Sequence, residues 1–279
     1  MFTAAEFTAI VLTASLLAGF VGSLTGLGGG IIVTPVLTIF LGVDIRYAIG
    51  ASLISVIATS SGSAAVYVRD GYSNIRIGMF LEIATTLGAL FGAFLGARIP
   101  TAGLGIIFGL ILLQAAWQTS RPSKPHAISN LPDSLADRLR LNGAYDVDGR
   151  AEHYGVRRVK TGFAMMFGAG TISGLLGIGS GSLKVVAMDQ AMQMPFKVST
   201  ATSNFMIGVT AAASASVYLS RGYVDPTIAM PVMLGVLCGS TIGAKFLTRL
   251  PVLALRRVFA VIVGTVGVQM IAKGLHGRI

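Results

Sequence analysis

Charged residues are scarce in this chain. They make up 11% of its 279 residues, less than half of the roughly 25% found in soluble domains. Hydrophobic residues make up 53%, and the mean hydropathy is +0.78. These values exclude an ordinary soluble domain and indicate an integral membrane protein. The net charge of +10 does not indicate a nucleic-acid partner, because nearly all of the 21 lysines and arginines lie in loops, where they orient a membrane protein.

Cysteine and histidine are nearly absent. The single cysteine, Cys238, lies inside an apolar run, which excludes a disulfide framework and a cysteine metal site. The three histidines, His126, His153 and His276, lie outside the apolar runs, which excludes an intramembrane histidine relay. The sequence also lacks a carboxylate pair within a run, a nucleophile with its base, and a Gly-Lys-Ser/Thr phosphate loop. We therefore expect no enzyme, no metal and no other cofactor.

Eight apolar runs separated by short charged turns dominate the chain. Most of them reach the 17 to 25 residues that a helix needs to cross about 30 Å of hydrocarbon. Helix is the expected form, because hydrocarbon offers no partner for a free backbone N–H or C=O. The runs cover residues 4–24, 48–68, 77–97, 101–117, 161–176, 198–219, 227–247 and 253–272.

One glycine-rich stretch occurs twice. Residues 26–30 (GLGGG) return as residues 177–181 (GIGSG), an offset of 151. The same offset holds without a gap over about 100 residues, which predicts a duplicated unit. Among the identical pairs in this register are Ser52 with Ser203, Thr59 with Thr210, Gly92 with Gly243, Pro100 with Pro251 and Phe108 with Phe259.

The first glycine cluster is followed by a run that is too short to cross the membrane. Residues 31–41 number 11, which is about 17 Å of helix. Each repeat, 1–118 and 161–279, is therefore a glycine-broken helix pair followed by three spanning helices. If the broken pair folds back, three crossings remain, and the repeats must be inverted. Inversion puts 14 lysines and arginines inside and five outside, against 13 and six for parallel repeats. We expect an all-α polytopic membrane protein with two homologous, inverted repeats.

The polar stretch between the repeats, residues 119–160, carries eight basic and five acidic residues, which favours the cytoplasmic side. Residues 134–141 favour a short helix. The Asn142-Gly143 and Asp148-Gly149 turn pairs, flanked by apolar residues, favour a small hairpin. This stretch is either a plain linker or a regulatory or gating element.

A glycine cluster directly before a short helix exposes N–H groups at the positive end of the helix dipole, which favours anion binding. Discontinuous helices that meet between inverted repeats hold the substrate in many secondary transporters. The alternative is that the glycines only allow close helix packing. The candidate ligands are Gly28, Gly29, Gly30 and Ile31 in the first cluster and Gly179, Ser180, Gly181 and Ser182 in the second.

Lys184 lies in the first turn of the helix that the second cluster opens, and Val33 takes its place in the first repeat. Intramembrane lysines are costly to bury and are functional by default. We expect Lys184 to neutralise the anion; pairing with Asp189 and reaching for the interface are the alternatives. Asp189 is either that partner or a proton or cation carrier that couples transport. Glu82, six residues into its run, lies either at the interface or buried.

Ser52 and Ser203 occupy the same place in the two repeats, and Asn204 follows Ser203. These three side chains either complete the ligand shell that faces the glycine clusters or tie helices together, as serine and asparagine commonly do in membranes.

The segments GSLTGLGGG at 22–30, SGLLGIGSG at 173–181 and KVSTATSNF at 197–205 resemble the TauE/SafE sulfite exporter family, also called the toluene sulfonate uptake permeases. The resemblance implies a bacterial or archaeal inner-membrane carrier for sulfite or small organosulfonates. The chain departs from the family pattern at Ser180, where the second cluster of the family usually has glycine.

Together these observations predict a multi-pass secondary transporter that moves a small sulfur-containing anion by alternating access, in the direction of export. Its partners are that anion and membrane lipid; a homo-oligomer is left open. The alternatives are an anion channel, an uptake permease for another small oxyanion, and a membrane scaffold that does not transport.

Overall fold

The computed structural model describes residues 3–25, 29–69, 73–120, 133–147, 150–246 and 252–277. Within these ranges the chain is almost entirely helical. Three described helical stretches are long and apolar enough to cross a membrane, and they cover Ile75–Gly96, Thr101–Gln118 and Val159–Leu176. Shorter apolar stretches of 10 to 17 residues cover Ala5–Val21, Gly30–Phe40, Ile45–Ser61, Pro226–Ile242 and Ala260–Leu275. The chain is therefore an all-α membrane protein, as its composition predicts.

Each of the eight predicted apolar runs coincides with a long helix, with ends that differ by a few residues. These helices are α1 (Ala4–Thr25), α3 (Ile45–Arg69), α4 (Ile75–Gly96), α5 (Thr101–Ser120), α7 (Val159–Leu176), α9 (Phe196–Ser220), α10 (Pro226–Phe246) and α11 (Val252–Leu275).

Two short helices follow the glycine clusters. The helix α2 (Gly30–Pro35) continues into a π-helical segment, η1 (Val36–Phe40), and α8 (Gly181–Val186) continues into η2 (Ala187–Ala191). The predicted short run at 31–41 falls on α2 and η1. The sequence does not predict the π-helical segments. Pro35 is not their shared cause, because Val186 stands 151 residues later, directly before η2.

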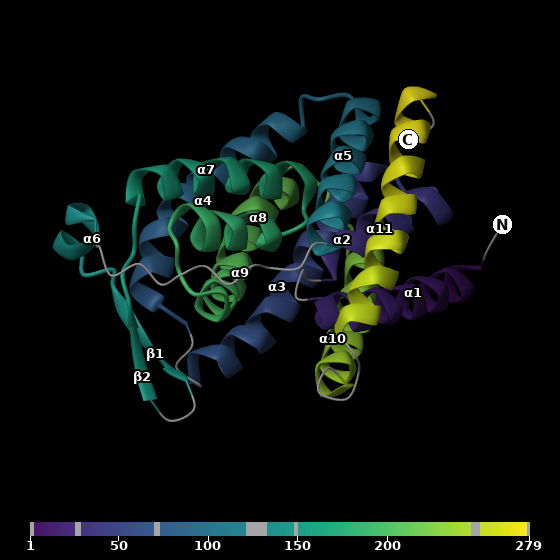
Figure 1. Cartoon of the computed structure of the whole chain (residues 1–279). Helices are drawn as coiled ribbons and strands as arrows, with labels where there is room; N and C mark the ends of the chain where they lie inside the picture. The colour runs from purple at the N-terminus through teal and green to yellow at the C-terminus, as the bar shows by residue number, and fades with distance from the viewer. Residues whose placement is uncertain are drawn as a thin grey trace.

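The long helices pack in pairs that join the two halves of the chain (Figure 1). The most extensive contacts join α1 to α10 and α4 to α7. Two further pairs join α5 to α11 and α3 to α9. The first long helix of each half therefore packs on a helix of the other half.

Glycines bring the backbones of α4 and α7 into direct contact. A Cβ atom added to Gly170 of α7 would lie 2.1 Å from the carbonyl oxygen of Thr85 on α4. A Cβ atom on Gly174, one turn later, would lie 2.0 Å from the carbonyl oxygen of Ala89. This spacing of small residues allows the close approach that stabilises helix pairs in membranes.

The pair α1 and α10 makes the same kind of contact. A Cβ atom on Gly19 would lie 2.4 Å from the carbonyl oxygen of Val236. Gly19 precedes Gly170 by 151 residues, and Val236 follows Thr85 by 151 residues. The two helix pairs therefore share one contact in the register that the sequence repeat predicts.

The helices α3 and α9 run in opposite directions. Tyr47, in the first turn of α3, packs edge-on against Tyr223, which follows α9, with ring centroids 5.7 Å apart. At the other end, the backbone N–H of Asn74, which follows α3, donates to the hydroxyl of Thr202 near the start of α9 at 3.0 Å. The beginning of each helix therefore lies beside the end of the other.

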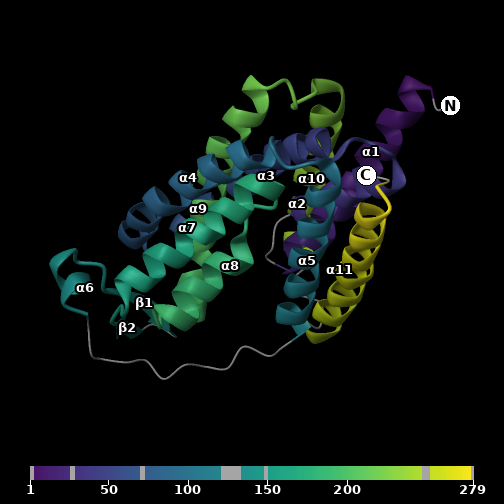
Figure 2. The same cartoon turned by 90° about the horizontal axis from the view of Figure 1, so that it is seen from above.

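The central stretch contains α6 (Ser134–Arg138) and an antiparallel hairpin of β1 (Gly143–Val147) and β2 (Arg150–Tyr154). Gly143 begins β1 opposite Tyr154 and does not form the predicted turn. The Asp148-Gly149 pair, which is predicted to turn the hairpin, lies outside the described residues. The hairpin and α6 lie at the opposite end of the molecule from both chain termini (Figures 1 and 2).

Asn74 ties this central stretch to α4. Its Nδ2 donates to the carbonyl oxygen of Leu141 at 3.0 Å and to the hydroxyl of Tyr154 at 2.9 Å. Its Oδ1 accepts from the backbone N–H of Ile77 at 3.2 Å and caps α4. Burial raises the pKa of the Tyr154 hydroxyl, so this hydroxyl stays neutral at physiological pH. The described part of the central stretch is therefore docked on the transmembrane helices.

Candidate functional site

The two glycine clusters meet at Ser52. The Ser52 hydroxyl, on α3, lies 3.0 Å from the carbonyl oxygen of Gly30 and 2.9 Å from that of Gly177. Gly30 opens α2, and Gly177 ends α7 with a φ of +68°. Ser52 is fully buried. The structure therefore brings the start of α2 beside the second cluster, whereas Gly28 lies outside the described residues.

Ser203 makes the matching contact on α9. Its hydroxyl donates to the carbonyl oxygen of Gly181 at 3.2 Å. Ser203 and Gly181 follow Ser52 and Gly30 by 151 residues, so both short helices are held at their first residue. The hydroxyl hydrogens of both serines are engaged by carbonyl oxygens here, and an anion would receive them only after these bonds open.

The remaining predicted ligands differ in their surroundings. Ile31 is buried, and Gly179 adopts a φ of +71°. Ser182 is half-buried. The side-chain amide of Asn204 donates to the carbonyl oxygen of Thr200 on its own helix at 3.2 Å, so its described bond does not reach a glycine cluster.

Ser180 and its counterpart Gly29 differ in backbone conformation. Gly29 is right-handed, with φ −67° and ψ −23°, whereas Ser180 is left-handed, with φ 44° and ψ 29°. The left-handed conformation costs a residue with a side chain about 1–2 kcal/mol. The Oγ of Ser180 is also buried and has no hydrogen-bond partner among the residues that the structure describes. Strained backbone and unsatisfied polar groups are features of functional sites.

We expect replacement of Ser180 to stabilise the protein in two separable steps. S180A removes a buried hydroxyl that has no described partner, and such a group costs about 1–3 kcal/mol. S180G removes this hydroxyl and also the left-handed strain of about 1–2 kcal/mol, partly offset by the entropy of glycine of about 0.5–1 kcal/mol. Thermal unfolding in detergent should therefore rank S180G above S180A and S180A above the wild type. A wild type that is more stable than both would show that the hydroxyl contributes a stabilising bond.

Lys184 belongs to a buried polar chain that crosses three helices. Its Nζ, on α8, donates to the Thr210 hydroxyl on α9 at 2.6 Å. The Thr210 hydroxyl donates to Oε1 of Glu82 on α4 at 2.7 Å. Lys184 is 0% exposed and Glu82 is 8% exposed. Of the two positions left open for Glu82, the structure has the buried one.

Asp189 is the acidic residue that the sequence offers as a partner of Lys184. It lies in η2 and is 6% exposed. The described hydrogen bond of the Lys184 side chain goes to Thr210. The sequence does not predict a role for Thr210. The only signal for it is that a threonine recurs at this place, 151 residues after Thr59, within an apolar helix.

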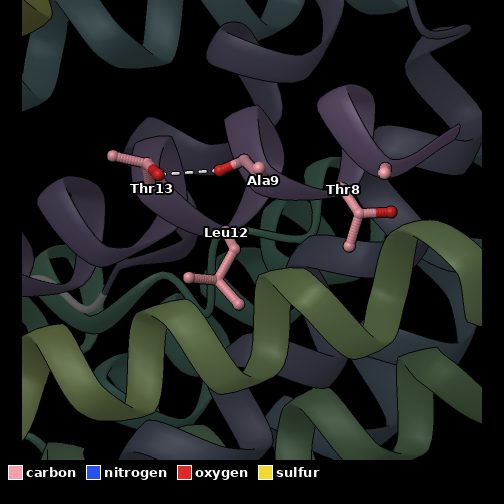
Figure 3. A pocket seen from close by; sticks show the side chains of 5 residues that line it. Thr8, Ala9, Leu12 and Thr13 are labelled. Atoms are coloured by element: carbon pink, nitrogen blue, oxygen red, sulfur yellow. Dashed lines mark hydrogen bonds between the residues drawn. The ribbon is translucent and has the colours of Figure 1, made fainter. Parts of the chain in front are cut away.

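A shallow surface hollow lies along α1, lined by Thr8, Ala9, Leu12 and Thr13 together with Ala5 (Figure 3). The Thr13 hydroxyl donates to the carbonyl oxygen of Ala9 at 2.7 Å. None of the lining residues is a predicted ligand, and none carries a charge, so this hollow lacks the chemistry expected for an anion.

Comparison with known proteins matches the chain to one family. A family model described as Sulfite exporter TauE/SafE matches residues 11–270. The chain is 27% identical over 273 residues to "Probable membrane transporter protein YunE" of Bacillus subtilis (strain 168), which covers 95% of this chain and 98% of that protein. It is 29% identical over 260 residues to a "Probable membrane transporter protein" of Xylella fastidiosa (strain 9a5c), with 91% of each chain covered. No solved structure matches the chain significantly.

Proposed function

Because the chain belongs to the TauE/SafE sulfite exporter family, we propose that it carries sulfite or a small organosulfonate out of the cell across the inner membrane. The chain is a membrane transporter, and a transporter of this family takes a small-molecule substrate. A site with amide donors, hydroxyls and one cation suits a small oxyanion, and the family points to sulfur oxyanions within that class. Export proceeds when the anion accumulates inside.

The proposed mechanism is alternating access between two inverted repeats, residues 1–118 and 161–279, joined by a cytoplasmic linker at 119–160. The opposite directions of α3 and α9 support the inversion. The matched contacts at Gly19 and Gly170 support the repeat. Inverted repeats that rock about a midplane site are a common transporter design.

The observation that carries this proposal is the meeting of the two glycine clusters at Ser52. One hydroxyl contacts both the first residue of α2 and the end of α7, so a movement of one repeat against the other changes the same small volume. Irregular backbone at membrane depth is tolerated only where it is buried in protein or lines a cavity.

In the proposed site, Lys184 neutralises the anion, and backbone amides of the two clusters solvate it. These amides lie near Gly28, Gly29, Gly30 and Ile31 and near Gly179, Ser180 and Gly181. The Ser180 hydroxyl, which has no hydrogen-bond partner within the described ranges, supports a larger contribution from the second cluster. Ser52, Ser182, Ser203 and Asn204 orient the anion once the repeats open. Asp189 is a candidate for the residue that couples transport to a proton or cation.

A thermal-shift screen of the purified protein tests the substrate class. A ligand at 100 times its Kd stabilises the folded state by about 2.7 kcal/mol. Sulfite, thiosulfate and methanesulfonate should raise the unfolding temperature, whereas acetate and other carboxylates should not. Equal shifts with every anion would indicate a general salt effect and would count against a site for sulfur anions.

Counterflow in proteoliposomes tests the mechanism. Radiolabelled sulfite should enter faster when unlabelled sulfite is inside, because a carrier can return in its loaded state. The flux of sulfite should also saturate as its concentration rises. Passive flux that does not saturate would indicate a channel. Binding without any flux would indicate a protein that does not transport.

A further inference from the structure

The hydrogen bonds that link Lys184, Thr210 and Glu82 are not needed for the helices to pack. The equivalent positions in the other half, 151 residues away, are Val33 on α2, Thr59 on α3 and Met233 on α10. The same three kinds of helix pack there without either charge. A buried ion pair is generally no more stabilising than apolar residues of similar volume.

The carboxylate of Glu82 is arranged so that it can gain a proton. Its Oε1 accepts from Thr210 at 2.7 Å and from the Thr86 hydroxyl at 3.1 Å. Its Oε2 is buried and has no hydrogen-bond partner within the described part of the chain. A proton added at Oε2 therefore displaces no existing bond.

The Thr210 hydroxyl can stop donating to Glu82 and still donate a hydrogen bond elsewhere. Its hydroxyl also lies 2.9 Å from the carbonyl oxygen of Met206, one turn earlier on α9. When Glu82 becomes neutral, the single hydroxyl hydrogen of Thr210 can turn to the carbonyl oxygen of Met206, so this donor stays satisfied.

Lys184 is the cation that faces Glu82. The other basic residues of the helices packed here, Arg76 on α4, Lys160 on α7 and Lys197 on α9, are exposed near the helix ends. Two further titratable groups are buried on these elements. One is Asp189 in η2, and the other is Tyr218 near the far end of α9, whose hydroxyl donates to the carbonyl oxygen of Leu175.

We propose that Glu82 is the resident counter-ion of Lys184, that the substrate anion replaces it, and that Glu82 then binds one proton from water. This inference rests on the proposed function, adds the proton as the coupling ion, and assigns the coupling to Glu82 in place of Asp189. The resting site holds one ammonium and one carboxylate. The loaded site holds the ammonium, a monovalent anion and a neutral carboxylic acid, so its net charge stays at zero.

Charge conservation is the physical reason for the coupling. An unpaired ion in a buried site is strongly unfavourable, so the anion does not enter while Glu82 remains ionised. The proton and the anion then move together without net charge. Transport of a monovalent anion becomes insensitive to membrane potential, and its direction follows the product of the two concentrations.

The test is proton uptake during binding of methanesulfonate, which remains fully ionised, so that any proton taken up belongs to the protein. The purified protein in weakly buffered detergent is titrated with methanesulfonate, and a pH-indicator dye reports the protons. The wild type should take up about one proton per anion, and its affinity should rise roughly tenfold for each unit by which pH falls while free Glu82 is ionised. E82Q, which keeps the acceptor oxygen at Oε1, should bind the anion with no proton uptake and no such pH dependence.

The matched control is E152Q, which removes a carboxylate of the hairpin and should behave like the wild type. Proton uptake by E82Q equal to that of the wild type would overturn the proposal, as would wild-type binding without uptake; both leave the proposed function standing. Failure of the wild type to bind either methanesulfonate or sulfite would remove the proposed function and this inference with it. If E82Q does not fold, the pH dependence of wild-type affinity decides alone, and a flat profile rejects the coupling.

Discussion

A G170A variant should lose a large part of its stability, whereas G168A, two residues earlier on the same helix, should not. The new Cβ atom of G170A would lie 2.1 Å from the carbonyl oxygen of Thr85 and 2.8 Å from its Cα atom. These are backbone atoms, so no side-chain rotation relieves the overlap, and α4 and α7 must separate. We expect a loss at or above the upper end of the about 1–3 kcal/mol that overpacking typically costs. Thermal unfolding in detergent measures it.

Gly168 is the internal control because a Cβ atom there meets nothing within 4 Å. The G168A variant gains helix propensity of about 1 kcal/mol at most, so it should unfold at the wild-type temperature or slightly above it. The G19A variant tests the equivalent contact on α1 and should resemble G170A. A G170A protein as stable as G168A would mean that the two helices are further apart than described.

The second large effect is expected at Lys184. A K184M variant leaves the Glu82 carboxylate buried without the ammonium that reaches it through the Thr210 hydroxyl, and leaving a buried charge uncompensated costs about 3–5 kcal/mol. It also removes the positive charge that is proposed to neutralise the anion. We therefore expect loss of stability and loss of sulfite flux in proteoliposomes. The double variant E82Q/K184M removes both charges and should recover most of the stability but none of the flux.

The comparison of K184M with E82Q/K184M separates the effect on stability from the effect on flux. K197M removes an exposed lysine from the start of α9 and should leave both properties unchanged. Sulfite flux that is unchanged in a folded K184M protein would remove Lys184 from the site. Recovery of flux in the double variant would mean that Lys184 serves only to neutralise Glu82.

The sequence predicted the long helices well because each is an apolar run bounded by charged turns. The offset of 151 residues pairs Ser52 with Ser203, and the two hydroxyls make the same kind of contact, 22 residues after Gly30 and Gly181. A gapless offset carries this information without any knowledge of the fold.

The sequence did not predict which side chains meet across helices. A soluble helix shows its buried face as an apolar stripe in the sequence. These helices are apolar on all sides, so the sequence does not show which face of α4 is turned towards α9. The bond from Thr210 to Glu82 spans 128 residues and depends on that rotation. The different backbones at Gly29 and Ser180 were also hidden, because the sequence aligns the two residues and shows only the change of residue type.

The exchange of first helices between the halves has a consequence for the synthesis of the chain. The face of α1 that carries Gly19 packs on α10, and α10 leaves the ribosome about 200 residues after α1. At about 5–20 residues per second this interval is on the order of 10 to 40 s. During that time α1 is held in the membrane without its native neighbour, so the insertion machinery or lipid must shield it, and this pair is among the last contacts of the fold to form.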